Sequence, residues 1–233
     1  MADSARRPPS PQTPRATTRR RSRRRAILAG LLAAVALLLV AGGSLTCRPA
    51  WYQPRSIDYR RLDEDKRAEL RLENTISAAL NAGRPVTIEL GQQQVNRWIA
   101  AREQLWPGEV PSLAPFHAPV LVFLDDNRIR AGALAEQGGL RLILSVTVRL
   151  ELTDDGLEVV WEGARAGLLP IPRSLIDRLA RGLSDRLDLP PNALRNGRLK
   201  LPSRATWPNG ERRFRIAELS IRAGTLRARL EPL

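Results

Sequence analysis

Residues 140–152 read LRLILSVTVRLEL, and this stretch decides the fold. Every second residue is leucine or valine, and most of the residues between them are polar or charged. Side chains alternate between the two faces of a strand, so a period of two predicts a β-strand with one apolar face. At about 3.3 Å per residue the strand spans ~43 Å, well beyond the usual ~5–6 residues. A strand of this length is expected to twist and curl strongly.

The segments around this stretch repeat the two-residue period. Asp154-Asp155-Gly156 is a turn sequence, so residues 157–166 are predicted to return as the second strand of a long hairpin. Upstream, Asp125-Asp126-Asn127 separates two more predicted strands, at 120–124 and 128–134. Asp and Asn favour such turns because their side chains bond their own backbone.

A short early strand and a final hairpin complete the predicted sheet. Residues 86–90 alternate between apolar and polar side chains, as does the segment that follows residue 210. In that last segment the parity shifts near Ala217 or Glu218, which indicates a β-bulge. We therefore expect one long, curved antiparallel β-sheet.

Three other segments carry apolar residues at helical spacing. They comprise residues 56–82, a segment that begins near Gly91 and a segment that begins at Pro172. Each is amphipathic and needs a surface to cover. The sequence thus predicts an α+β domain over residues 56–233, with the sheet packed on amphipathic helices at its concave side.

An arginine-rich segment precedes a long uncharged run. RRRSRRR at 19–25 is followed by 21 residues without a charge at 26–46, which as a helix would span about 31 Å, close to the ~30 Å core of a bilayer. Arginine on the N-terminal side favours a cytoplasmic N-terminus. We predict a disordered cytoplasmic tail (1–25), a transmembrane signal anchor (26–46), a juxtamembrane linker (47–55) and a main domain outside the cytoplasmic membrane.

Two alternatives to the uncleaved anchor stay open. A cleaved secretory signal is disfavoured because the apolar run and the segment before it are both longer than usual for such signals. Cys47 lies where a lipidated cysteine could stand, but the preceding Ser44-Leu45-Thr46 is a poor lipidation motif. In the linker, Trp51 and Tyr52 are expected at the level of the lipid headgroups.

The positive charge is concentrated in the tail. The chain carries a net charge of +14, of which nine arginines and one aspartate give +8 to residues 1–25. The tail has no aromatic residue to stack on bases, so nucleic acid is an unlikely partner. A single cysteine excludes an intrachain disulfide.

No catalytic, cofactor or metal motif stands out. His117 is the only histidine, so zinc sites and Ser–His–Asp triads are hard to assemble. The paired aspartates at 125–126 and 154–155 are better explained as turns. We expect a non-enzymatic protein without a cofactor or a metal site.

An apolar groove is the candidate binding site. A curled sheet with one leucine face, covered by helices and tethered beside a bilayer, could hold an acyl chain. The same side chains could equally form a solid core. The residues expected at this groove are Trp98, Trp106, Phe116, Phe123, Leu142, Leu144, Val146, Trp161, Leu175 and Leu179.

Two functions follow from these alternatives. A hollow core favours binding of lipid or another apolar ligand at the outer face of the cytoplasmic membrane. A solid core favours a non-enzymatic scaffold that contacts an envelope protein or an anionic polymer through strand edges or arginines.

Three short motifs carry a family resemblance. VTIEL at 86–90, VNRWI at 95–99 and AGLLPIP at 166–172 occur in an order that resembles the YpmS-like family of uncharacterised bacterial membrane-anchored proteins. The resemblance implies an N-terminal anchor, an extracytoplasmic domain and a tubular lipid-binding (TULIP-like) fold. It implies no active-site residue.

Overall fold

The computed structural model describes residues 42–108, 116–137, 139–154, 156–174, 194–195, 198–202, 204–207 and 212–233. The chain forms two compact units, Met1–Gly43 and Ser44–Leu233. Among the described residues, no helix has both the length and the apolar character needed to cross a bilayer. The predicted tail, residues 26–41 of the predicted anchor and most of the helix predicted from Pro172 lie outside the described residues.

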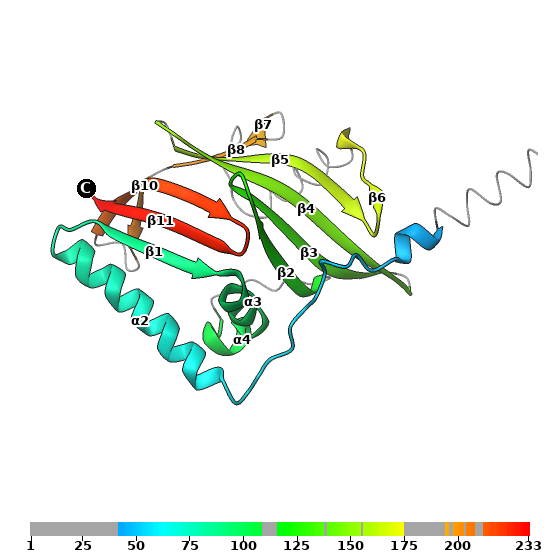
Figure 1. Ribbon diagram of the computed structural model, residues 1–233, viewed down its shortest axis with the longest axis horizontal. Coiled ribbons are helices and arrows are strands. Elements are labelled where there is room, and N and C mark those ends of the chain that lie inside the picture. Colours follow the sequence, from blue (N-terminus) through cyan, green and yellow to red (C-terminus); the bar gives the residue numbers. More distant parts are fainter. Residues whose placement is uncertain are drawn as a thin grey trace, which may run out of the picture. The chain divides into compact units, whose positions relative to one another are not determined.

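The larger unit is an α+β domain with a large antiparallel sheet, as predicted (Figure 1). The helices are α2 (Leu62–Asn81), α3 (Gln92–Ala100) and α4 (Arg102–Leu105). The strands are β1 (Val86–Gly91), β2 (Phe116–Leu124), β3 (Arg128–Gln137), β4 (Leu140–Thr153), β5 (Gly156–Ala166), β6 (Leu169–Pro170), β7 (Leu194–Arg195), β8 (Arg198–Leu201), β9 (Arg204–Trp207), β10 (Arg212–Arg222) and β11 (Thr225–Pro232). The predicted bulge in the last hairpin is confirmed between Ile216 and Glu218.

The strands form two sheets, so the expectation of a single sheet was wrong. The small sheet has the order β1-β11-β10-β9, and the large sheet has the order β2-β3-β4-β5-β8-β7, with β6 paired to β5. The early strand β1 pairs with the C-terminal strand β11 instead of with β2. Alternation along one strand identifies its faces but not its neighbour, which is why the sequence pattern could not separate the two sheets.

Hydrogen bonds between two hairpin turns connect the two sheets. In the β2–β3 turn, Asp126 and Asn127 have positive φ angles of 59° and 57°, as a tight hairpin requires. Asn127 Oδ1 accepts a hydrogen bond from Ile221 N at 2.7 Å, and Asp125 Oδ1 accepts one from Ala223 N at 3.1 Å. The turn was predicted correctly, but these two side chains bond the β10–β11 hairpin and not their own backbone.

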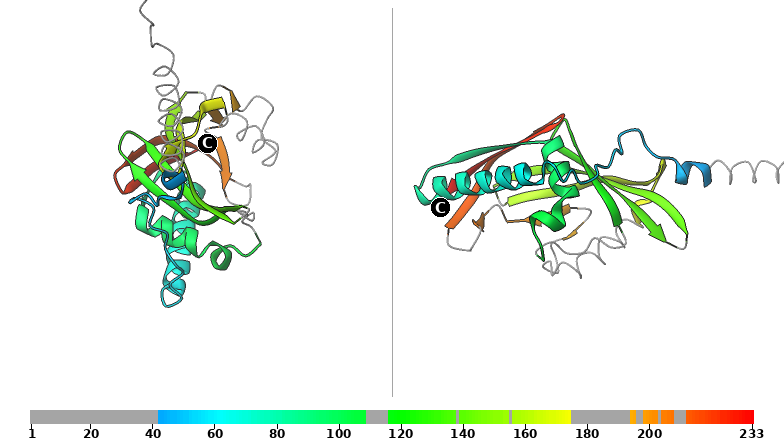
Figure 2. Two further views of the ribbon diagram at one scale, coloured as in Figure 1. Left: turned by 90° about the vertical axis from the view of Figure 1, so that its right-hand side faces the viewer. Right: turned by 90° about the horizontal axis from the view of Figure 1, so that it is seen from below.

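Helix α2 covers the small sheet (Figure 2). Ile76 and Leu80 of the helix form a buried cluster with Phe214 and Leu230 of the sheet. The first turn of α2 carries acidic residues, which favour a helix N-terminus. The buried carboxylate of Asp65 meets Arg97 Nε at 3.1 Å, so an ion pair links α2 to α3.

The large sheet has two chemically different faces. Strand pairing places the apolar residues of β4 opposite those of β3 and β5 on one face, among them Ala131, Ala133 and Ala164. The other face carries arginines from three neighbouring strands. They are Arg128 and Arg130 of β3, Arg149 of β4 and Arg165 of β5.

A charged network lies at the far end of the arginine face. Glu158, which is buried, accepts hydrogen bonds from Arg198 at 2.8 Å and pairs with Lys200 at 3.2 Å. These two cations, Arg198 first, lower the pKa of the Glu158 carboxyl below its ordinary value.

The Glu158→Gln variant should be less stable than wild type at pH 7. A carboxyl whose folded-state pKa is lowered stabilises the fold above its unfolded-state pKa, and this stabilisation is lost as the pH falls through the folded-state value. The stability difference between the two proteins should therefore shrink at pH values below about 4. Chemical denaturation of both proteins at pH 7 and at pH 3 measures this difference in unfolding free energy. Glu89→Gln, at an exposed position of β1, is the control and should change stability at pH 7 by no more than about 0.5 kcal/mol.

Candidate apolar and arginine-lined cavities

Helix α3 seals the outer edge of the large sheet. Asn96 is buried, and its side chain donates to Leu121 O at 2.7 Å and accepts from Leu121 N at 2.8 Å. Gln92 Oε1 accepts from Phe123 N at 2.8 Å. The two amides thus act as a neighbouring strand for β2, which is the edge strand of the large sheet.

The predicted linker packs onto the arginine face of the same sheet. Tyr52 is only 4% exposed, packs with Val120 and Ile143 and donates its hydroxyl hydrogen to Ala118 O at 2.8 Å. The Trp51 ring lies so close to Gly132 that a Cβ there would collide with it. The expectation of headgroup-level rings was wrong for Tyr52, since this ring completes a core that the strands leave open.

An apolar cavity of about 520 Å³ lies on the leucine face of the large sheet. Ala131 and Ala133 of β3 contribute to its lining, as do Ala164 of β5 and Ile99 of α3. Small side chains on the strands leave space that the larger residues around them do not fill. Its volume is typical of small-molecule sites, which range from roughly 300 to 1,000 Å³.

Half of the predicted groove residues lie at this cavity. They are Trp106, Phe116, Leu144, Val146 and Trp161. Trp98 and Phe123 are buried outside it, at 7% and 3% exposure, and Leu142 of β4 is half-buried and does not line it. Leu175 and Leu179 lie outside the described residues.

A β-bulge in β5 brings Trp161 to the cavity. Thr147 pairs with Gly163, but the next residue, Val148, pairs with Trp161, so Glu162 is an extra residue in β5. Without this bulge, Trp161 and Ala164 would point to opposite faces, since they are three residues apart. This bulge was not predicted from the sequence, because the residues around Glu162 do not alternate clearly enough to show that one of them is extra.

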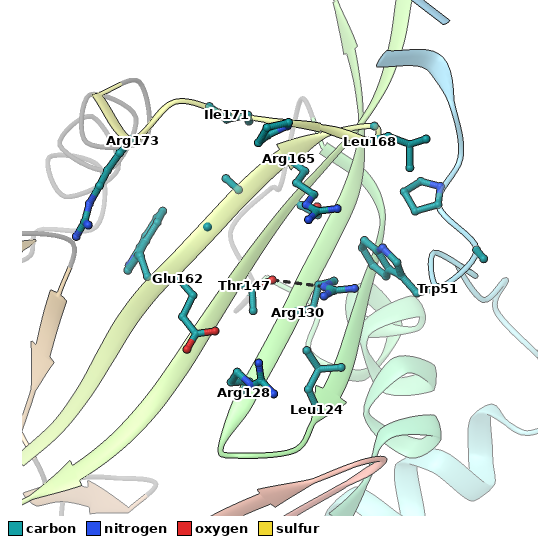
Figure 3. A pocket seen from close by; sticks show the side chains of 18 residues that line it. Trp51, Leu124, Arg128, Arg130, Thr147, Glu162, Arg165, Leu168, Ile171 and Arg173 are labelled. Carbon is teal, nitrogen blue, oxygen red and sulfur yellow. Dashed lines mark hydrogen bonds between the residues drawn. The ribbon is translucent and has the colours of Figure 1, made fainter. Parts of the chain in front are cut away.

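A second cavity, of about 670 Å³, lies on the arginine face (Figure 3). Its charged lining comprises Arg128, Arg130, Arg165, Arg173 and Glu162. Trp51 closes one side, and Leu168 and Ile171 come from the segment after β5. Sequence reasoning missed this site, although the alternation of Arg128 and Arg130 with apolar residues was a signal for one basic face.

Two of these arginines have no carboxylate partner among the described residues. Arg130 donates from Nε to Thr147 Oγ1 at 3.4 Å and places its guanidinium 5.5 Å from the centre of the Trp51 ring. Arg165 is exposed, and its side chain forms no hydrogen bond or ion pair with a described residue, although its backbone pairs with β4 and β6. Glu162 pairs instead with Arg149, at 3.3 Å. Among the described lining residues, positive charges therefore outnumber negative ones.

Neither cavity is lined by a histidine or a cysteine among the described residues. His117 is an exposed residue of β2 and lines neither cavity. Within the described part of the chain, no three metal-ligating side chains come together. Comparisons with protein-family models, with curated proteins and with solved structures find no match for this chain.

Proposed function

We propose that the domain binds an apolar or amphiphilic ligand, with lipid as the first candidate, and that the segment at 26–46 anchors it at the outer face of the cytoplasmic membrane. The observation that carries this proposal is the apolar cavity on the leucine face of the large sheet. Three of the residues expected at a groove, Leu144, Val146 and Trp161, line it. Each methylene group of a chain moved from water into such a site contributes about 0.8 kcal/mol to binding.

The β2 edge of the large sheet is relevant to the alternative scaffold function, because a scaffold could bind its partner there. A strand edge with unpaired backbone groups favours recruitment of a partner strand. On β2, Asn96 and Gln92 already occupy backbone groups at this edge. This arrangement supports ligand binding over strand addition at β2. The resemblance to membrane-anchored, TULIP-like proteins points in the same direction.

Filling the cavity tests the proposal. The Ala133→Phe variant should retain several-fold less lipid than wild type, because the new ring would occupy the cavity that Ala133 lines. The measurement is native mass spectrometry of the full chain, purified from cells and released from nanodiscs. The control, Ala135→Phe, lies two residues further along the same face of β3 and does not line the cavity.

The stability of Ala133→Phe is an independent test of whether the site is hollow. In a hollow site the added ring should be tolerated, whereas in a solid core it should cost about 1–3 kcal/mol of unfolding free energy. A ligand-free wild type, together with a strongly destabilised Ala133→Phe, would contradict lipid binding and favour the scaffold function.

A further inference from the structure

We infer that the arginine-lined cavity holds the anionic headgroup of an amphiphile whose chain occupies the apolar cavity. This inference rests on the proposed function and narrows its ligand to one class, lipids with a phosphate or carboxylate headgroup. Two features point to this ligand. The arginines complement an anionic headgroup, and the two cavities lie on opposite faces of the sheet at β5.

Two arginines of the second cavity are available to bind an anion. Arg130 and Arg165 come from β3 and β5, and both line the same cavity (Figure 3). Neither meets a carboxylate among the described residues, and Arg130 stacks on Trp51, which orients its guanidinium. Guanidinium groups bind phosphate and carboxylate through paired hydrogen bonds, which makes arginine suited to anionic headgroups.

The two cavities share part of their lining. Ser145, Trp161, Ala164 and Ile171 border both of them. One ligand that reaches both cavities would thus pass Trp161 and Ala164 of β5 and Ile171, which follows β6.

Part of the edge of β5 is left without a neighbouring strand. Strand β8 pairs with residues up to Val160, and β6 pairs with Arg165 and Ala166. Between them, residues 161–164 have no strand partner on this side among the described residues. Ile171 N donates a hydrogen bond to Ala164 O there, at 2.9 Å. The gap separates a basic face from an apolar face, as the two ends of an amphiphile require.

The test is the lipid selectivity of the full chain. Wild type is assembled in nanodiscs of equal phosphatidylcholine and phosphatidylglycerol, and retained lipids are identified by native mass spectrometry. Wild type should retain phosphatidylglycerol with a preference of roughly tenfold, the size expected from one charge-assisted hydrogen bond. Arg165→Gln and Arg130→Gln/Arg165→Gln should lose this preference and still retain lipid. The control Arg213→Gln/Arg222→Gln removes the same charge from exposed positions of β10 and should keep it.

Several outcomes would overturn the inference. An unchanged preference in both arginine variants would show that these side chains do not read the headgroup, while the proposed function would survive. Retention of phosphatidylglycerol by Ala133→Phe at the wild-type level would show that chain and headgroup do not share one ligand. Loss of the preference in millimolar inorganic phosphate, with lipid retention unchanged in Ala133→Phe, would identify a site for free anions instead. A wild type that retains no lipid would contradict the proposed function itself.

Discussion

Replacing Asn96 with leucine should lower the free energy of unfolding by about 2–4 kcal/mol. Leucine has a similar size, but it neither donates to Leu121 O nor accepts from Leu121 N, so two backbone groups at the β2 edge lose their partners. An unsatisfied buried polar group costs about 1–3 kcal/mol, which is more than the hydrogen bond itself contributes. Urea unfolding of the full chain in a nonionic detergent, followed by tryptophan fluorescence, measures the change.

Two variants separate this edge effect from helix propensity. Gln93→Leu changes the exposed neighbour on α3 and should alter stability by no more than about 0.5 kcal/mol. Asn96→Asp keeps an acceptor for Leu121 N but loses the donor to Leu121 O, so it should be destabilised as well. If Asn96→Leu were no less stable than Gln93→Leu, the hydrogen bonds between Asn96 and Leu121 would contribute nothing to stability.

Replacing Tyr52 with alanine should cost about 3–5 kcal/mol, as expected for a large buried ring. Tyr52 fills a cluster with Val120 and Ile143, and its hydroxyl bonds Ala118 O. Tyr52→Phe, which removes only the hydroxyl, should cost about 0.5–1.5 kcal/mol. The same urea titration measures both variants.

An exposed tyrosine nearby provides the control. Tyr59 is 71% exposed, so Tyr59→Ala should change stability by no more than about 0.5 kcal/mol. Equal effects at the two tyrosines would mean that residues 47–55 act as a mere linker.

Burial also raises the pKa of Tyr52. The stabilisation that its neutral hydroxyl contributes should therefore be present below the unfolded-state pKa of tyrosine and be lost at higher pH. Tyr52→Phe removes this pH dependence.

The elements of the fold were largely readable from local patterns. The alternation at 140–152 predicted β4 almost to its ends, and the turn residues at 125–127 predicted the β2–β3 hairpin. The parity shift near Ala217 predicted the bulge in β10. Each of these features depends on residues next to one another in the chain, where the faces of a strand and the φ angles of a turn are decided.

Half of the residues predicted for the candidate site line the apolar cavity. Leu144 and Val146 were expected at an apolar groove because they lie on the leucine face, and both line the cavity. Phe123 and Trp98 were expected there because they are aromatic, but aromatic residues fill cores as readily as they line grooves. Ala131 and Ala133 were missed because a hollow site is made by small side chains, which carry no signal of their own.

The sequence by itself determined the α+β class, the long hairpin and the presence of one apolar and one polar face on its first strand. Only the tertiary structure decided that there are two sheets, that Asn96 closes the edge of one of them and that the arginines surround a cavity. The physical reason is distance along the chain. Asn96 and Leu121 are 25 residues apart, and Asp125 and Ala223 are 98 apart, so these contacts leave no periodic trace in the sequence. Periodicity reports how one segment faces its surroundings, whereas hydrogen bonding and packing between distant segments decide what those surroundings are.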